Sequence, residues 1–247
     1  MKSLSKVLLV AALLAGANYS FANTHSTAKV KSHADVQDRH LSGFNSVDVS
    51  GSFDVYIVQG ATESVKVEAP ADIMDHIVTE VEDGVLKIHD KHNSGWNWGN
   101  WMGGHKKVAV YVSATDLNSI GITGSGDVNF KGGIHTASLK LWVTGSGDVI
   151  GRVDVKTLEC KISGSGDMKL MGRAENSALS LSGSGDFSGK GLETQNTLVR
   201  VSGSGDAAIN ASSSINASVS GSGDVSYTGS PKDVVKSKSG SGDISGD

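Results

Sequence analysis

With 247 residues the chain is long enough for one large domain or two small ones, and its 26 acidic residues outnumber its 22 basic ones. This acidic balance argues against nucleic acid or an anionic membrane surface as a partner. The single cysteine, Cys160, cannot form an internal disulfide, so the fold must be held by its own core.

Residues 1–22 are organised like a secretory signal peptide. Lys2 and Lys6 form a basic start, residues 7–15 form an apolar stretch, and residues 20–22 supply the small residues that a signal peptidase reads. The apolar stretch is too short to cross a membrane, and no later stretch approaches the roughly 18 apolar residues of a spanning helix, so no transmembrane segment is predicted. We therefore expect export through a cleaved signal peptide to the periplasm or the cell surface. Loss of the two lysines shifts the formal net charge from −4 to −6.

After the signal peptide the sequence predicts a short leader and one β-domain. Residues 23–39 are polar and without pattern, and they are predicted to be a flexible leader. From residue 40 onward apolar and polar residues alternate, as around Val47 and Val49, which indicates strands with one buried face. Residues 40–247 are therefore predicted to form a single domain whose first part is less regular.

Two local signals divide the first part of this domain. Asp83–Gly84, between the runs VTEVE and VLKIH, is a strong turn signal for a β-hairpin. Residues 93–107, NSGWNWGNWMGGHKK, are rich in glycine and asparagine and are predicted to be a loop between two strands.

From residue 124 onward the tetrapeptide Gly-Ser-Gly-Asp (GSGD) occurs seven times. The aspartates of successive copies are 21, 19, 19, 20, 18 and 19 residues apart, and a near-constant period of this kind indicates a repeat architecture. Residues 51–54, GSFD, look like a decayed first copy. The seven aspartates are Asp127, Asp148, Asp167, Asp186, Asp206, Asp224 and Asp243.

The flanks of the motif repeat as well as the motif itself. The residues two and four positions before each first glycine are mostly apolar, while the positions between them are mostly polar or glycine. Cys160 falls in one of these inward columns, so we expect a small buried side chain there. Lys236 and Lys238 occupy the same columns in the last copy, where they are expected to form a polar cap.

These repeats predict an all-β fold, and two geometries fit the unit of strand, corner and strand. Each repeat is either a hairpin of an antiparallel meander or barrel, or one coil of a parallel β-solenoid. The solenoid is favoured, because the same residue class recurs at the same position, which is what the stacking of coils about 4.8 Å apart rewards. The predicted coil has about 19 residues with a GSGD corner.

Several segments in order resemble a known family. They are SGFNSVDVSGSFDVYIVQG, EVEDGVLKIHD, KKVAVYVSATDLNSIGITGSGDV and the GSGD series. The family is the one described as putative auto-transporter adhesin, head GIN domain, and the resemblance covers roughly residues 38–245. It implies a right-handed parallel β-helix in an exported bacterial protein, and the name of the family implies adhesion. It brings no catalytic residues.

The recurring aspartates raise the question of calcium. Calcium-binding β-rolls carry a Gly- and Asp-rich turn about every nine residues, so their carboxylates come from paired turns, whereas here the turn comes once per coil. Two carboxylates about 5 Å apart in water repel by roughly 0.8 kcal/mol, and a hydrogen bond to a nearby backbone N–H returns about 0.5–1.5 kcal/mol. The corner is therefore stable without a cation, and neither a metal nor a cofactor is predicted.

Trp96, Trp98 and Trp101 in the loop are the predicted ligand-binding residues. They are three of the four tryptophans of the chain. Such side chains either pack against the core or form an exposed aromatic platform for a glycan or a partner protein. His89, His92 and His105 flank the tryptophans without a cysteine or carboxylate that would complete a zinc pattern.

No pattern of nucleophile and base indicates an enzyme, because the sequence contains neither G-x-S-x-G nor H-E-x-x-H. The sequence therefore predicts an exported, non-enzymatic binding or adhesion module of the bacterial cell envelope, with a glycan or an envelope or surface protein as partner. Two alternatives remain: a structural envelope solenoid without a specific ligand, and a polysaccharide-active enzyme.

Overall fold

The computed structural model describes residues 34–91 and 108–246, which lie within one compact unit, Ser32–Asp247. The strands of its first part are β1 (Ala34–Asp38), β2 (Ser46–Gly51), β3 (Asp54–Gln59), β4 (Ser64–Pro70), β5 (Ile77–Glu82), β6 (Val85–Asp90), β7 (Ala109–Ala114) and β8 (Ser119–Gly124). Those of its second part are β9 (Val128–Gly145), β10 (Val149–Gly164), β11 (Met168–Gly183), β12 (Phe187–Gly203), β13 (Ala207–Gly221), β14 (Val225–Thr228), β15 (Asp233–Gly240) and β16 (Ile244–Gly246). Over the described ranges, no helix is long and apolar enough to cross a membrane.

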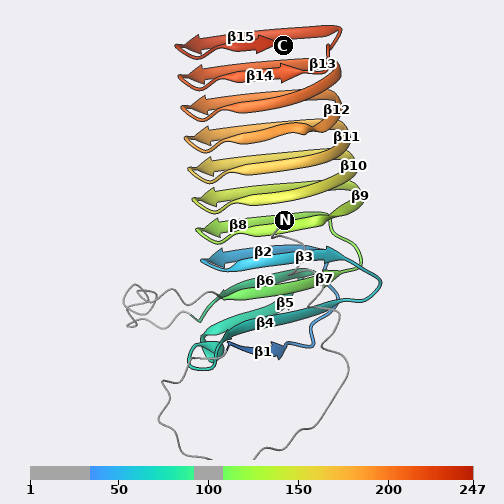
Figure 1. Ribbon diagram of the computed structural model, residues 1–247, viewed down its shortest axis with the longest axis vertical. Helices are drawn as coiled ribbons and strands as arrows, with labels where there is room; N and C mark the ends of the chain where they lie inside the picture. Colours follow the sequence, from blue (N-terminus) through green and yellow to red (C-terminus); the bar gives the residue numbers. More distant parts are fainter. Residues whose placement is uncertain (1–33, 92–107, 247) are drawn as a thin grey trace, which may run out of the picture. The chain divides into compact units, whose positions relative to one another are not determined.

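The second part is a parallel β-solenoid. Each of the long strands β9 to β13 runs from one GSGD corner to the next, and Figure 1 shows these strands stacked as successive coils. Neighbouring long strands pair in parallel, and their registers align the corner glycines, for example Gly145 with Gly164 and Gly164 with Gly183. The parallel pairing confirms the predicted solenoid and excludes the meander of hairpins, whose neighbouring strands would be antiparallel.

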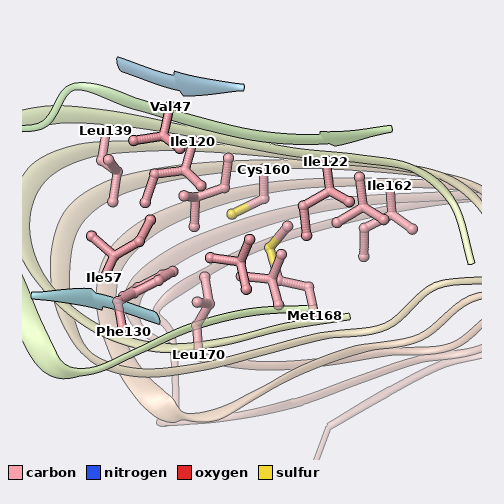
Figure 2. Packing of buried hydrophobic residues seen from close by; sticks show 14 of the residues in the cluster. Val47, Ile57, Ile120, Ile122, Phe130, Leu139, Cys160, Ile162, Met168 and Leu170 are labelled. Atoms are coloured by element: carbon pink, nitrogen blue, oxygen red, sulfur yellow. The ribbon is translucent and has the colours of Figure 1, made fainter. Parts of the chain in front are cut away.

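The core lies between the two walls of each coil. Leu141, Cys160 and Leu179 are aligned in one inward column, and all three are buried. Figure 2 shows Ile57, Phe130 and other side chains of one wall facing Val47, Ile120 and Ile122 of the other.

Cys160 fills the place of a small apolar side chain, as the sequence predicts. Only 3% of its surface is exposed. Burial raises the pKa of the Cys160 thiol well above its ordinary value, so the reactive thiolate does not form at neutral pH.

The corners hold the coils together through the backbone. The carbonyl oxygen of Gly145 accepts hydrogen bonds from the N–H groups of Ser165 and Gly166 in the next coil, at 2.8 and 3.1 Å. The same pair of bonds recurs at every GSGD corner, and the first of them is made to Gly51. The predicted decayed corner at residues 51–54 is thus a real corner that begins the stack.

Both glycines of the motif are required by this stacking. The first has a φ of 119° to 134° in all seven copies, a region that side chains other than glycine rarely adopt. The second has no such φ, but a Cβ on Gly166 would lie 2.1 Å from the carbonyl oxygen of Gly147 in the preceding coil. Both glycines of the motif are therefore needed because the coils approach one another so closely.

The first part of the unit is less regular, as predicted. Here β2 pairs in parallel with β6 and β8, while β5 and β6 form an antiparallel hairpin. Its turn consists of Asp83 and Gly84, which have φ values of 50° and 77° and so fit the predicted turn signal.

The prediction of a flexible leader over residues 23–39 is wrong for its last part. Residues Ala34–Asp38 form β1, which pairs antiparallel with β4 from Ala34 opposite Pro70 to Asp38 opposite Lys66. All five residues of β1 are exposed, so apolar patterning carried no signal of it. The strand is formed by backbone pairing at a sheet edge, which polar side chains do not prevent.

The last coil is capped by lysines. The register places Lys236 beside Ala217 and Lys238 beside Val219, which are inward positions in the preceding coil. The Lys236 ammonium instead donates to the carbonyl of Ile244 at 2.9 Å and lies 4.9 Å from the centre of the Tyr227 ring. The predicted polar cap is confirmed, and it makes the end of the core unattractive to another apolar strand.

The close approach of the corners can be tested at Gly166. A Gly166→Ala variant should lose about 1–3 kcal/mol of unfolding free energy, since the added methyl group must displace the backbone of the preceding coil. Ser165→Ala, at the exposed neighbouring position, should stay within about 0.5 kcal/mol of the parent. Urea unfolding followed by circular dichroism measures both. Equal stability of the two variants would contradict the role given to the second glycine.

Candidate binding face

The predicted ligand-binding residues Trp96, Trp98 and Trp101 lie outside the described residues, as do His92 and His105. The structure describes the chain on both sides of them, up to Lys91 and again from Val108. Of the flanking histidines only His89 is described, and its Nε2 lies 3.2 Å from the Glu80 carboxylate. The interpretation of residues 93–107 as a Trp-rich contact loop stays a prediction.

The aspartates of the GSGD corners form a ladder of hydrogen bonds between coils. Oδ1 of Asp148 accepts from the backbone N–H of Asp167 at 2.9 Å, and Oδ1 of Asp167 accepts from the N–H of Asp186 at 2.8 Å. Six such bonds, from 2.7 to 3.1 Å long, connect the seven aspartates. The sequence suggested bonds to nearby N–H groups within the same corner; the partner instead belongs to the next coil.

The ladder is therefore a structural device, and its contribution can be measured at Asp167. Asp167→Ala leaves the N–H of Asp186 without its acceptor and should cost about 0.5–1.5 kcal/mol of unfolding free energy. Asp167→Asn keeps an oxygen at the same place and should recover most of this loss. If both variants unfold at the same urea concentration as the parent, the hydrogen bond contributes nothing.

We also expect that the aspartate ladder does not bind calcium. No group of three or more His, Cys, Asp or Glu side chains that could hold a metal ion occurs in residues 34–91 and 108–246. We expect the melting temperature of the protein to be the same in millimolar calcium and in excess chelator, because a ligand shifts stability only when it binds the folded state. A rise with calcium would return the corner aspartates to the metal-binding candidates.

The fourth tryptophan, Trp142, lies on an outward wall of the solenoid. The register pairs it with Gly121 of β8, and its indole lies over this glycine: a Cβ on Gly121 would be 1.9 Å from Cε2 and 2.0 Å from Cζ2 of the indole. Because Gly121 has no side chain, the indole ring can lie directly over its backbone. The side chain is partly exposed, so an aromatic surface is available on the wall.

A row of side chains continues from Trp142 across neighbouring strands. On one side Gly121 pairs with Asp48 of β2, and on the other side Trp142 pairs with Lys161 of β10. Ser180 and Arg200 follow on β11 and β12. We call this row the Trp142 face, and it consists of Asp48, Trp142, Lys161, Ser180 and Arg200.

The carboxyl group of Asp48, at one end of the Trp142 face, is partly buried. Burial raises the pKa of the Asp48 carboxyl above its ordinary value, an effect that the Lys87 ammonium partly offsets. Its Oδ1 is buried and has no hydrogen-bond partner in the part of the chain that the structure describes. A buried polar atom without a hydrogen-bond partner costs free energy.

The other end of the Trp142 face is hollowed. The small side chains of Ala178 and Ser180 on β11 lie between larger ones on β10 and β12, and together they form a groove of about 320 Å³. Glu159 and Lys161 line it on one side, and Leu198 and Arg200 line it on the other. Glu159 is paired across the coils with Lys140 at 3.2 Å. The face therefore combines an aromatic surface with a shallow polar groove.

Two other surfaces of the unit carry aromatic or charged side chains. Tyr56 and Tyr111 stack on the outward side of β3 and β7 with ring centres 5.4 Å apart. Burial and a hydrogen bond from its hydroxyl to Glu68 raise the pKa of Tyr111 to about 12. Tyr56 is 42% exposed, and Tyr111 is partly buried beneath it.

The third surface is a groove of about 670 Å³ on the side of the coils away from the GSGD corners. One pair of its charges is neutralised, because Arg173 makes two hydrogen bonds to Asp154, at 2.9 and 2.6 Å. Lys156, Glu175 and Glu193 also line the groove. The Arg173 guanidinium lowers the pKa of Asp154 and keeps it ionised. The groove is larger than the one on the Trp142 face but lacks an aromatic side chain.

Comparison with known proteins identifies the family. Residues 43–231 match the family described as "Putative auto-transporter adhesin, head GIN domain". The chain belongs to this family. The resemblance of its sequence segments is thereby confirmed. A search of proteins with curated functions finds no match.

Solved structures of similar proteins share the fold of this family member. A putative adhesin from Bacteroides fragilis NCTC 9343 is 27% identical, with a TM-score of 0.79, over 87% of this chain and 97% of that chain. A putative adhesin from Parabacteroides distasonis ATCC 8503 is 22% identical, with a TM-score of 0.70, over 88% of this chain and 98% of that one. A putative lipid binding protein from the same organism is 21% identical, with a TM-score of 0.68 and the same coverage. The last two identities support the fold alone.

Proposed function

We propose that this head GIN family member is an exported binding module of the bacterial cell envelope that holds a glycan on the Trp142 face. The proposal is carried by one observation: the indole of Trp142 lies over Gly121 on an outward wall, next to polar side chains. A flat aromatic ring with hydrogen-bonding groups around it suits a sugar ring, which has apolar faces and polar edges. The names of the similar proteins, adhesins above all, support a binding role.

The Trp-rich loop is proposed as a second contact region. Trp96, Trp98 and Trp101 lie between Asp90, at the end of β6, and Ala109, at the start of β7. Both strands belong to the first part of the unit, and β6 pairs with β2, the strand that carries Asp48. Export by cleavage of residues 1–22 and a location in the periplasm or at the cell surface belong to the same proposal.

The test compares two sets of variants of the mature chain on a glycan array, with lipid vesicles as a separate arm. Trp142→Ala should weaken glycan binding at least about tenfold, since central aromatic residues typically contribute 2 kcal/mol or more. The triple variant Trp96→Ala, Trp98→Ala and Trp101→Ala tests the loop separately. Tyr56→Ala, which removes an exposed aromatic side chain from another wall, is the matched control.

Three outcomes would overturn parts of the proposal. Unchanged binding by Trp142→Ala removes the Trp142 face, and unchanged binding by the triple variant removes the loop. Binding to vesicles with none to glycans would point to a lipid-binding role instead. Binding to neither would favour a structural solenoid without a ligand. Circular dichroism melts must first show that every variant is folded.

A further inference from the structure

The two basic side chains of the Trp142 face have no counter-charge. Lys161 and Arg200 are exposed, and neither forms an ion pair with any residue in the described ranges. Some other cations of the solenoid are paired, as Lys140 is with Glu159 at 3.2 Å and Arg173 is with Asp154. Lys161 and Arg200 differ from other exposed cations, such as Arg152 and Lys169, because they belong to the row that carries the aromatic ring.

Their spacing follows from the coil geometry. Lys161 and Arg200 are separated by the single strand that carries Ser180, so they lie two strand spacings apart, about 9–10 Å. The groove over Ala178 and Ser180 lies between them. An extended ligand that follows the solenoid axis would meet the indole first, then one cation, then the groove and then the second cation.

These two cations belong to a protein that is acidic overall. The formal net charge is −4, and it becomes −6 if the signal peptide is removed, so the protein as a whole repels anions. At ordinary ionic strength charges interact over only about 8–10 Å, so two unpaired cations can still attract an anionic group locally. A neutral sugar would accept ordinary hydrogen bonds from them, whereas an acidic one would also be attracted by their charge at two points.

We propose that the ligand of the Trp142 face is an acidic polysaccharide laid along the solenoid axis. One sugar ring stacks on the indole of Trp142, and carboxylate or sulfate groups on the sugars pair with Lys161 and Arg200. The inference rests on the proposed glycan-binding function and specifies its ligand class. An arginine or lysine beside an aromatic platform supplies the charge-assisted hydrogen bonds that such anionic groups accept.

The experiment measures binding of the mature chain to three glycans: polygalacturonate, chondroitin sulfate and a neutral galactan. The first carries carboxylates, the second carries both carboxylates and sulfates, and the third carries no charge. The parent chain should bind at least one acidic glycan at least tenfold more tightly than the neutral one. Raising the salt from about 0.05 M to about 0.5 M should weaken the binding, because added salt screens the ion pairs.

The variants locate the effect on the wall. Lys161→Glu with Arg200→Glu should reduce acidic-glycan binding at least tenfold. The matched control, Arg152→Glu with Lys169→Glu, makes the same change of charge at exposed positions outside the Trp142 face and should change binding less than twofold. If the reversal variant does not fold, Lys161→Gln with Arg200→Gln replaces it.

The results separate the two proposals. Equal binding of acidic and neutral glycans, with no effect of the Lys161 and Arg200 variants, overturns the acidic ligand while the glycan-binding function stands. Equal losses in the face and control variants mean that only overall charge matters, which also overturns it. No binding to any of these glycans or to the array overturns both proposals together.

Discussion

The whole solenoid depends on how closely the backbone of one coil approaches the next at the GSGD corners. From Gly51 to Gly221, the carbonyl of each first glycine accepts two N–H groups from the following coil, and each second glycine of the GSGD copies leaves no space for a methyl group. This fixes the register of the strands on both sides of the corner. Once the register is fixed, every outward position is stacked above its counterpart in the preceding coil. Columns of apolar side chains form the core, and the remaining columns form the surface.

Much of this arrangement follows from the sequence because the corner is also an alignment marker. Counting from the first glycine gives the buried columns, the place of Cys160, and the lysine cap. The same count, three residues before each first glycine, gives Asp48, Gly121, Trp142, Lys161, Ser180 and Arg200. The row of the Trp142 face can therefore be found in the sequence as a column of the repeat. Composition alone indicates residues 93–107 instead, because it responds to clustered tryptophans and not to the columns of the repeat.

Other features had no sequence signal. The exposed strand β1 has no apolar alternation, since it is held by backbone pairing with β4. Side-chain preferences predict hydrogen bonds within a turn, whereas the Asp148 carboxylate accepts a hydrogen bond from the backbone of the next coil. The indole of Trp142 lies on Gly121 because the glycine leaves room across the strands, a relation between residues 21 positions apart. Contacts of this kind become visible only when the coils are stacked.

Because the lysine cap closes the last coil, the number of coils can change without loss of the cap. In a stack each coil touches only its neighbours, so a coil gained or lost by duplication or deletion leaves the Lys236 and Lys238 end and the β2 end unchanged. Such a change would lengthen or shorten the outward walls by one strand spacing, about 4.8 Å, without repacking the core. The length of a surface built in this way therefore changes in discrete steps, one for each GSGD corner.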